Sequence, residues 1–398
     1  MRYLAWLFGC SCLLQAHNVE TLISRAMDTH PTIKAIESRV NAAQSAVDRA
    51  DNLSDPSLNF RINDIQFQDI SNRSIEPMQT NSVSITQKLP WFGKREALKE
   101  SERAQKEVVF ASLKEAQATL AERIKKNSAQ VWMINKLVTI VDKTSSLARQ
   151  NIELSEAYNT LKNNQHASIL ASRLVLSRLK TEHSQLESDK QTALAQLSYL
   201  SGMEVEEVDV SMQEPKIPSF EELHENLVHN YRLEMLENIK RKQARLVTSA
   251  QLDQNIDPIV QAEYSQRQAF KDYVSVGIGF SLPIYGTQES IVEQRSAELL
   301  AAQSDTVNLR EELEAELKAL YAKLENQQRI YHIIKDESLP QIEHMFDLVR
   351  LNVTSGGDMS KYIDLLEQKL ALEKEMVRAQ GSFYMTMAEI DRLTGKIK

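Results

Sequence analysis

The chain has 398 residues, of which 42% are hydrophobic, 26% charged and 6% aromatic, and its formal net charge is −8. This acidic balance argues against a nucleic-acid partner, because proteins that bind nucleic acids usually present a basic face. No run of about 18 apolar residues occurs, which excludes an ordinary transmembrane helix.

Residues 1–16 predict an export signal, because Arg2 precedes an apolar run over residues 3–14. The two cysteines, Cys10 and Cys12, both lie in this segment. The rest of the chain can therefore cross into an oxidising compartment without forming wrong disulfides. The stretch before Cys10 loosely resembles a lipoprotein cleavage box, which leaves acylation of Cys10 open. An apolar N-terminus without a targeting role is the alternative.

The first half predicts short helices, a β-hairpin and two long helices. In chain order these are helices over residues 18–29 and 32–51, strands at about 57–67 and 81–89, and helices over 92–161 and 168–200. Asp55-Pro56 ends the second helix, Pro90 ends the second strand, and Ser201-Gly202 ends the last helix. An acidic linker over residues 204–218 follows.

The second half predicts the same series again. Its elements are helices over residues 220–228 and 233–252, strands at about 258–266 and 272–282, and helices over 290–352 and 362–393. Pro340 should kink the first of the long helices. Leu89-Pro90 and Leu282-Pro283 are 193 residues apart, as are Ser201-Gly202 and Thr394-Gly395. The sequence therefore predicts an internal duplication, with repeats at 17–203 and 219–398.

Neither repeat alone can cover the apolar stripes of its helices or pair the edges of its strands. The helix over residues 92–161 would be roughly 100 Å long, and its narrow apolar stripe needs neighbouring helices to cover it. The strands alternate apolar and polar residues, a pattern typical of outer-membrane barrels with apolar residues outside. Four strands cannot enclose a channel, so several copies related by cyclic symmetry would have to close one barrel.

Several segments together resemble the TolC-type outer-membrane efflux proteins over nearly the whole mature chain. They are residues 87–95 (QKLPWFGKR), 279–286 (GFSLPIYG), 339–341 (LPQ) and 357–366 leading to 393–395. The Gly93-Lys94-Arg95 motif is most similar to the cation-efflux branch that serves copper/silver and cobalt–zinc–cadmium pumps.

This resemblance implies a mainly α fold with a small β part, built from an internally duplicated helix-strand-strand-helix protomer. It implies a homotrimer with a 12-stranded transmembrane β-barrel and a long periplasmic α-helical tunnel. The expected location is the outer membrane of a Gram-negative bacterium, with most of the chain in the periplasm. The expected partners are a periplasmic adaptor (membrane fusion) protein and an inner-membrane pump of the resistance-nodulation-division type.

The resemblance also implies positions for functional residues. Asp364 and Glu367 are candidates for an acidic ring at the channel aperture, with a solvated helix face as the alternative. The adaptor-facing helix tips would be Asn163, Asn164, Gly356, Gly357 and Asp358. The strand-to-helix turns would be Pro90, Gly93, Pro283 and Gly286. The sequence departs from the family at Thr354, where an aromatic residue is expected, so gate contacts of that aromatic do not carry over.

The sequence thus predicts a passive exit duct for metal cations, without catalytic residues, cofactor or metal site. Two alternatives stay open. One is the outer-membrane duct of a type I protein-secretion or drug-efflux system. The other is a soluble coiled-coil scaffold without a barrel.

Overall fold

The computed structural model describes residues 17–67, 69–159, 166–354 and 360–397. The predicted export signal with Cys10 lies outside these ranges. So do all five predicted adaptor-facing residues, namely Asn163, Asn164, Gly356, Gly357 and Asp358. Predictions about them stay predictions.

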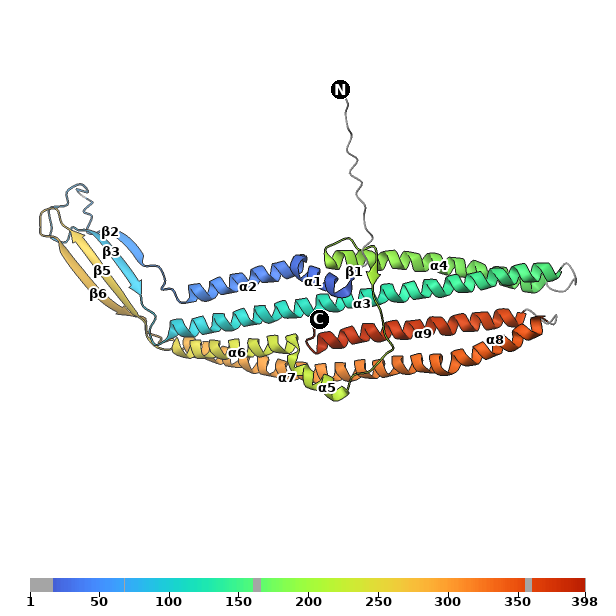
Figure 1. Cartoon of the computed structure of the whole chain (residues 1–398). Helices are drawn as coiled ribbons and strands as arrows, with labels where there is room; N and C mark the ends of the chain where they lie inside the picture. The colour runs from blue at the N-terminus through green and yellow to red at the C-terminus, as the bar shows by residue number, and fades with distance from the viewer. Residues whose placement is uncertain (1–16, 68, 160–165, 355–359, 398) are drawn as a thin grey trace, which may run out of the picture. The chain divides into compact units, whose positions relative to one another are not determined.

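Two series of elements follow one another along the chain (Figure 1). The first is α1 (Val19–Thr29), α2 (Pro31–Ala50), β2 (Ser57–Ile62), β3 (Asn81–Lys88), α3 (Lys94–Asn159) and α4 (His166–Ser201). The second is α5 (Phe220–Asn226), the 3₁₀ helix η1 (Leu227–His229), α6 (Tyr231–Leu252), β5 (Pro258–Gln266), β6 (Tyr273–Phe280), α7 (Thr287–His332), the π-helix η2 (Ile333–Ser338), α8 (Leu339–Thr354) and α9 (Ser360–Leu393).

Two compact units form, and each takes segments from both halves of the sequence. Unit 1 contains Met1–Ala35, Lys114–Asn230 and Glu311–Lys398, and unit 2 contains Ile36–Leu113 and Tyr231–Arg310. The units therefore cut across the predicted repeats at 17–203 and 219–398. The repeat boundaries stay a prediction about sequence, separate from this structural division.

The sheet of unit 2 joins the two hairpins in the order β2-β3-β5-β6, with all neighbours antiparallel (Figure 1). One row across it contains Phe60, Val83, Tyr264 and Val274, which are register partners from strand to strand. Apolar residues thus share one face, as the alternation in the sequence predicted.

Strand β2 ends at Ile62, although the sequence predicted a strand over about 57–67. The ladder stops there because Asp64 adopts a left-handed backbone conformation, with φ of 55°. Just beyond it, the guanidinium of Arg73 donates hydrogen bonds to the carbonyl oxygens of Asn63, at 2.5 Å, and Asp64, at 2.8 Å. These carbonyl groups are held by a side chain, and the chain continues as a loop.

Unit 1 has an apolar core between its long helices. Its fully buried members include Ile124 of α3, Leu197 of α4, Leu317 of α7 and Ile390 of α9. The short strands β1 (His17–Asn18) and β4 (Val208–Asp209) form a parallel pair that the sequence did not predict.

Residues 204–218, predicted as an acidic linker, are held against the helices of unit 1. The side chain of Gln328 donates a hydrogen bond to the carbonyl of Pro215 at 2.9 Å. The hydroxyl of Tyr384 donates to the carbonyl of Gln213 at 3.0 Å. The segment therefore ties α7 to α9 as well as connecting the two halves of the chain.

The interruption predicted at Pro340 takes the form of the π-helix η2, which lies just before it. Proline has no N–H, so the carbonyl of Asp336 cannot receive the usual α-helical hydrogen bond. The N–H of Leu339 instead donates to the carbonyl of Ile334, five residues earlier. The helix widens for six residues and then continues as α8.

Helix α9 ends at Leu393, and the glycine two residues further on has no space for a side chain. Gly395 has a φ of 73°, and a Cβ at this position would lie 2.3 Å from the carbonyl oxygen of His229. Gly286, at the start of α7, has the same φ but no heavy atom within 4 Å of the corresponding position. Comparing substitutions at these two glycines therefore distinguishes the cost of backbone strain from the cost of steric overlap.

We expect Gly395→Ala to destabilise the protein clearly more than Gly286→Ala. Both variants carry the strain of a left-handed residue, about 1–2 kcal/mol, but only Gly395→Ala also displaces the His229 backbone. Thermal unfolding followed by circular dichroism in detergent measures the difference. Equal melting temperatures for the two variants would contradict this account of the α9 terminus.

Candidate functional site

The sheet of unit 2 exposes its apolar face. Phe60 and Val276 are 75% and 74% exposed, whereas Ser82, Ser84 and Ser265 are buried. The other large apolar residues exposed on the strands are Leu58, Ile62, Val83, Ile85, Tyr264, Tyr273, Val274, Ile278 and Phe280. A sheet in water buries its apolar side chains, so this sheet is inverted. Such a surface is suited to an apolar environment.

Both outer strands of this sheet have an open edge. Within the described chain, β2 pairs with β3 alone and β6 pairs with β5 alone. An unpaired edge presents free N–H and C=O groups, which cost several kcal/mol each in an apolar environment. The sheet therefore requires further strands at both sides if its apolar face is to meet lipid.

The strand-to-helix turns occur where the sequence predicted them. Pro90 follows β3, and Gly93, with φ of 77°, immediately precedes α3. Pro283 and Gly286 occupy the corresponding places between β6 and α7. Trp91 and Tyr285 are both well exposed in these turns.

Lys94 of the Gly93-Lys94-Arg95 motif makes a buried ion pair at the base of the sheet. Its Nζ lies 2.9 Å from Oδ1 of Asp257 and donates a hydrogen bond to the carbonyl of Asn255 at 2.7 Å. The N–H of Trp91 also donates to Asp257, at 3.2 Å. Burial raises the pKa of Asp257, but the hydrogen bonds from Lys94 and Trp91 outweigh burial and hold that pKa below its ordinary value.

Arg95, the next residue of the motif, binds Asp51, which follows α2. Its guanidinium pairs with the side chain of Asp51 at 3.3 Å and donates a hydrogen bond to the Asp51 carbonyl. Lys99 also binds the Asp51 carboxylate, at 2.8 Å. The motif therefore joins two segments, one after α2 and one before β5, to the start of α3. These residues are part of the family resemblance in the sequence, but the sequence did not predict their partners.

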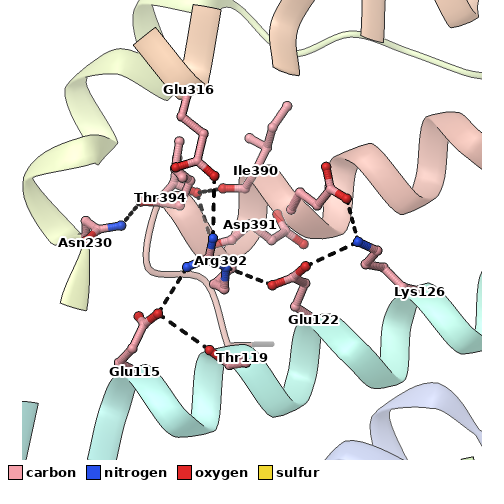
Figure 2. Close-up of polar contacts among 12 residues, drawn as sticks. Glu115, Thr119, Glu122, Lys126, Asn230, Glu316, Ile390, Asp391, Arg392 and Thr394 are labelled. Atoms are coloured by element: carbon pink, nitrogen blue, oxygen red, sulfur yellow. Dashed lines mark hydrogen bonds and ion pairs between the residues drawn. The ribbon is translucent and has the colours of Figure 1, made fainter. Parts of the chain in front are cut away.

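A second ionic cluster lies in unit 1 around Arg392, in the last turn of α9 (Figure 2). Its guanidinium binds three carboxylates on two other helices: Glu115 at 3.0 Å and Glu122 at 2.8 Å, both on α3, and Glu316 at 3.6 Å on α7. Burial lowers the pKa of Arg392, but the three glutamates outweigh burial and raise that pKa above its ordinary value. Arg392 thus stays charged and joins α3, α7 and α9.

Lysines extend this cluster along α3. Lys125 binds Asp391 at 2.7 Å, and Lys126 binds Glu389 at 2.5 Å. Figure 2 shows Lys126 beside Glu122, which it also binds, at 3.5 Å. All the members lie on helices of unit 1, and each carboxylate has a basic partner. The cluster is a structural joint, and we assign it no transport role.

The two predicted aperture residues differ in their surroundings. Asp364 is exposed, and it lies on α9 between the buried residues Ile363 and Leu365. Glu367 is half-buried and forms an ion pair with Arg178 of α4. About two turns further along α9, Lys374 pairs with Glu182 of α4. Both predicted carboxylates are on α9, but Arg178, which the sequence did not reveal, neutralises one of them.

Two features are absent from the described ranges. No helix there is long and apolar enough to span a membrane. No three histidine, cysteine or acidic side chains are grouped there in a way that could hold a metal ion.

Comparison with solved structures identifies the fold. VceC, an outer membrane protein of Vibrio cholerae, matches with a TM-score of 0.79 and 14% sequence identity, covering 95% of this chain and 96% of VceC. CusC, described for its transmembrane channel formation, matches with a TM-score of 0.76 and 12% identity, covering 94% of this chain and 91% of CusC. The CmeC outer membrane channel of Campylobacter jejuni matches with a TM-score of 0.74 and 12% identity, covering 95% and 85%.

The chain has the fold of the TolC-type outer-membrane efflux proteins. The predicted resemblance is thereby confirmed at the level of the fold. No protein-family model matches the sequence. A search of curated proteins found no similar sequence. The TolC-type fold therefore rests on the arrangement of elements, since 12–14% identity leaves little similarity in sequence.

In this TolC-type fold, we expect removal of Lys94 to be costly, because the buried Asp257 carboxylate then keeps only the exposed Lys88, at 3.5 Å, as a cationic partner. Lys94→Met should lower the free energy of unfolding by at most about 3–5 kcal/mol, the cost of an uncompensated buried charge. The double variant Lys94→Met/Asp257→Asn should recover part of this loss, since asparagine can still accept the hydrogen bond from Trp91. Thermal or denaturant unfolding in detergent measures both.

Lys99→Met is the matched control, because its partner Asp51 is half-exposed. Lys99→Met should lower the free energy of unfolding by only about 0–1 kcal/mol. If Lys94→Met were no more harmful than Lys99→Met, the pair with Asp257 would not be a structural joint.

Proposed function

We propose that this protein is the outer-membrane exit duct of a tripartite efflux system. The observation that carries the proposal is the inverted, open-edged sheet on a fold shared with outer-membrane channels. Lipid would cover the apolar face, and further strands would pair with β2 and β6.

A homotrimer satisfies these requirements. Three copies of a four-stranded sheet give twelve strands, and a ring of identical copies pairs β6 of one protomer with β2 of the next. The buried serines of β3 and β5 would then face the lumen. Trp91 and Tyr285 would lie at the inner boundary of the membrane, where amphipathic aromatic side chains are enriched.

The duct would be passive and would depend on partner proteins for its energy. We propose that a periplasmic adaptor protein contacts Asn163, Asn164, Gly356, Gly357 and Asp358, and links the duct to an inner-membrane pump of the resistance-nodulation-division type. Most of the chain would then lie in the periplasm of a Gram-negative bacterium.

The proposed cargo is metal cations. Its support is the exposed Asp364, because three copies of a carboxylate in a narrow mouth concentrate negative potential and favour cations. Glu367 contributes less, since Arg178 already neutralises it. The Gly93-Lys94-Arg95 motif gives no further support, because its two basic residues are used in the joints at the base of the sheet.

We expect Asp364→Asn to reduce the cation preference of single channels in planar bilayers severalfold. Glu367→Gln should change it much less, because that carboxylate is paired. Arg178→Gln should raise the preference by releasing the charge of Glu367. If Asp364→Asn left the ratio of cation to anion permeability unchanged, the acidic ring would be excluded.

Deletion of the gene tests the function as a whole. The deletion strain should become sensitive to metal salts, and its sensitivity to dyes and antibiotics should stay unchanged. Sensitivity to dyes and antibiotics instead would favour a drug-efflux duct. The native protein should also be recovered with the outer membrane as a trimer that detergent, but not salt, releases. Recovery in the soluble fraction would contradict the proposal and favour a coiled-coil scaffold.

A further inference from the structure

The loop between β2 and β3 exposes large apolar side chains at the end of the sheet. Phe67 is 91% exposed and Met78 is 74% exposed, and three isoleucines of the loop are also exposed. We call Ile65, Phe67, Ile70, Ile75 and Met78 the apolar rim. The loop between β5 and β6 is shorter and mainly polar, with Arg267, Lys271 and Asp272, and its exposed large apolar residue is Phe270.

Polar groups hold the interior of this loop. Gln79 is buried, and its Oε1 accepts hydrogen bonds from the N–H groups of Ile75, at 3.0 Å, and Glu76, at 3.3 Å. Its Nε2 donates to the carbonyl of Asn72 at 3.2 Å. Arg73 binds the carbonyls of Asn63 and Thr80 at the base of the loop. The loop is therefore a hydrogen-bonded structure whose apolar side chains point outwards.

This arrangement repeats the inversion of the sheet, with polar atoms inside and apolar side chains outside. In water, an exposed side chain of this size forgoes the favourable free energy of burial. Five such side chains on one loop indicate an apolar environment at that end of the sheet. The exposed acids Asp64, Asp69 and Glu76 indicate that the same loop also meets water or polar headgroups.

The lengths of the strands show which environment fits. Strand β5 has nine residues, β3 and β6 have eight each, and β2 has six. At about 3.3 Å per residue and a tilt of about 40°, eight residues span about 20 Å of membrane thickness. The apolar band of an outer-membrane barrel is about 25 Å tall. Strands of eight residues, such as β3 and β6, are therefore about 5 Å too short, which is about the depth that the apolar rim could supply.

We propose that the apolar rim inserts into the acyl chains at the edge of the outer leaflet and completes the lipid-facing band above β2 and β3. Its ligand is lipid, and the acids of the loop stay at the headgroup level. This inference rests on the proposed function, because it needs the sheet to lie in a membrane.

Fluorescence of variants with one added cysteine tests the rim. Met78→Cys, Val276→Cys and Lys271→Cys are labelled with an environment-sensitive fluorophore, and the trimer is placed in phosphatidylcholine vesicles containing a nitroxide-labelled acyl chain. Met78 and Val276 have the same exposure, 74%, so they are matched sites on the loop and on the sheet. The unsubstituted chain, labelled in parallel, gives the contribution of Cys10 and Cys12.

We expect lipid quenching at Met78 to equal that at Val276 within about twofold and to exceed that at Lys271 at least threefold. Quenching at Val276 but not at Met78 would overturn the rim and leave the proposed function intact. Blue-shifted emission at Met78 without lipid quenching would show a protein partner, such as a neighbouring copy, and would also overturn it. Absence of quenching at Val276 and Met78 alike would contradict the membrane location itself.

Discussion

The structure depends on one constraint, the satisfaction of backbone hydrogen bonds in a sheet whose apolar face is turned outwards. Phe60, Val274 and Val276 can face lipid only if no N–H or C=O group of the strands is left unpaired there. Among the described strands, antiparallel pairing meets this need between β2, β3, β5 and β6, and leaves it unmet at the outer edges of β2 and β6. The sheet therefore needs further strands at both edges before its apolar face can meet lipid.

Ion pairs are concentrated where segments distant in the sequence meet. Lys94 and its acceptor Asn255 are 161 residues apart, and Arg392 and Glu115 are 277 apart. Apolar packing alone allows long helices to shift along one another, because successive turns of an apolar stripe are alike. The guanidinium of Arg392 can bind its three carboxylates in one alignment only, so it fixes the register of α3, α7 and α9. Lys94 does the same at the base of the sheet.

The sequence predicted the elements well because their signals are local. Period-two alternation located all four strands of the sheet, and Pro90 and Pro283 marked the turns that follow. The end of β2 was wrong by five residues, because Asp64 and Arg73 decide it and neither belongs to the alternation. The partners of Lys94, Arg392 and Glu367 could not be predicted, since each pair depends on contacts between distant segments. The sequence predicted Asp364 and Glu367 as equal members of an acidic ring, but the ion pair with Arg178 neutralises Glu367.

The π-helix η2 determines where the continuous helical segment formed by α7, η2 and α8 can lose a residue without rotating α8. Ile334 and Ile342 are eight residues apart, a separation that would place them about 80° apart on a regular α-helix, yet both are buried. A π turn holds one extra residue, so the two isoleucines face the core as residues seven apart would. Loss of one residue from η2 would leave α8 facing the same way. Loss of one residue from the middle of α7 would rotate everything after it by about 100°.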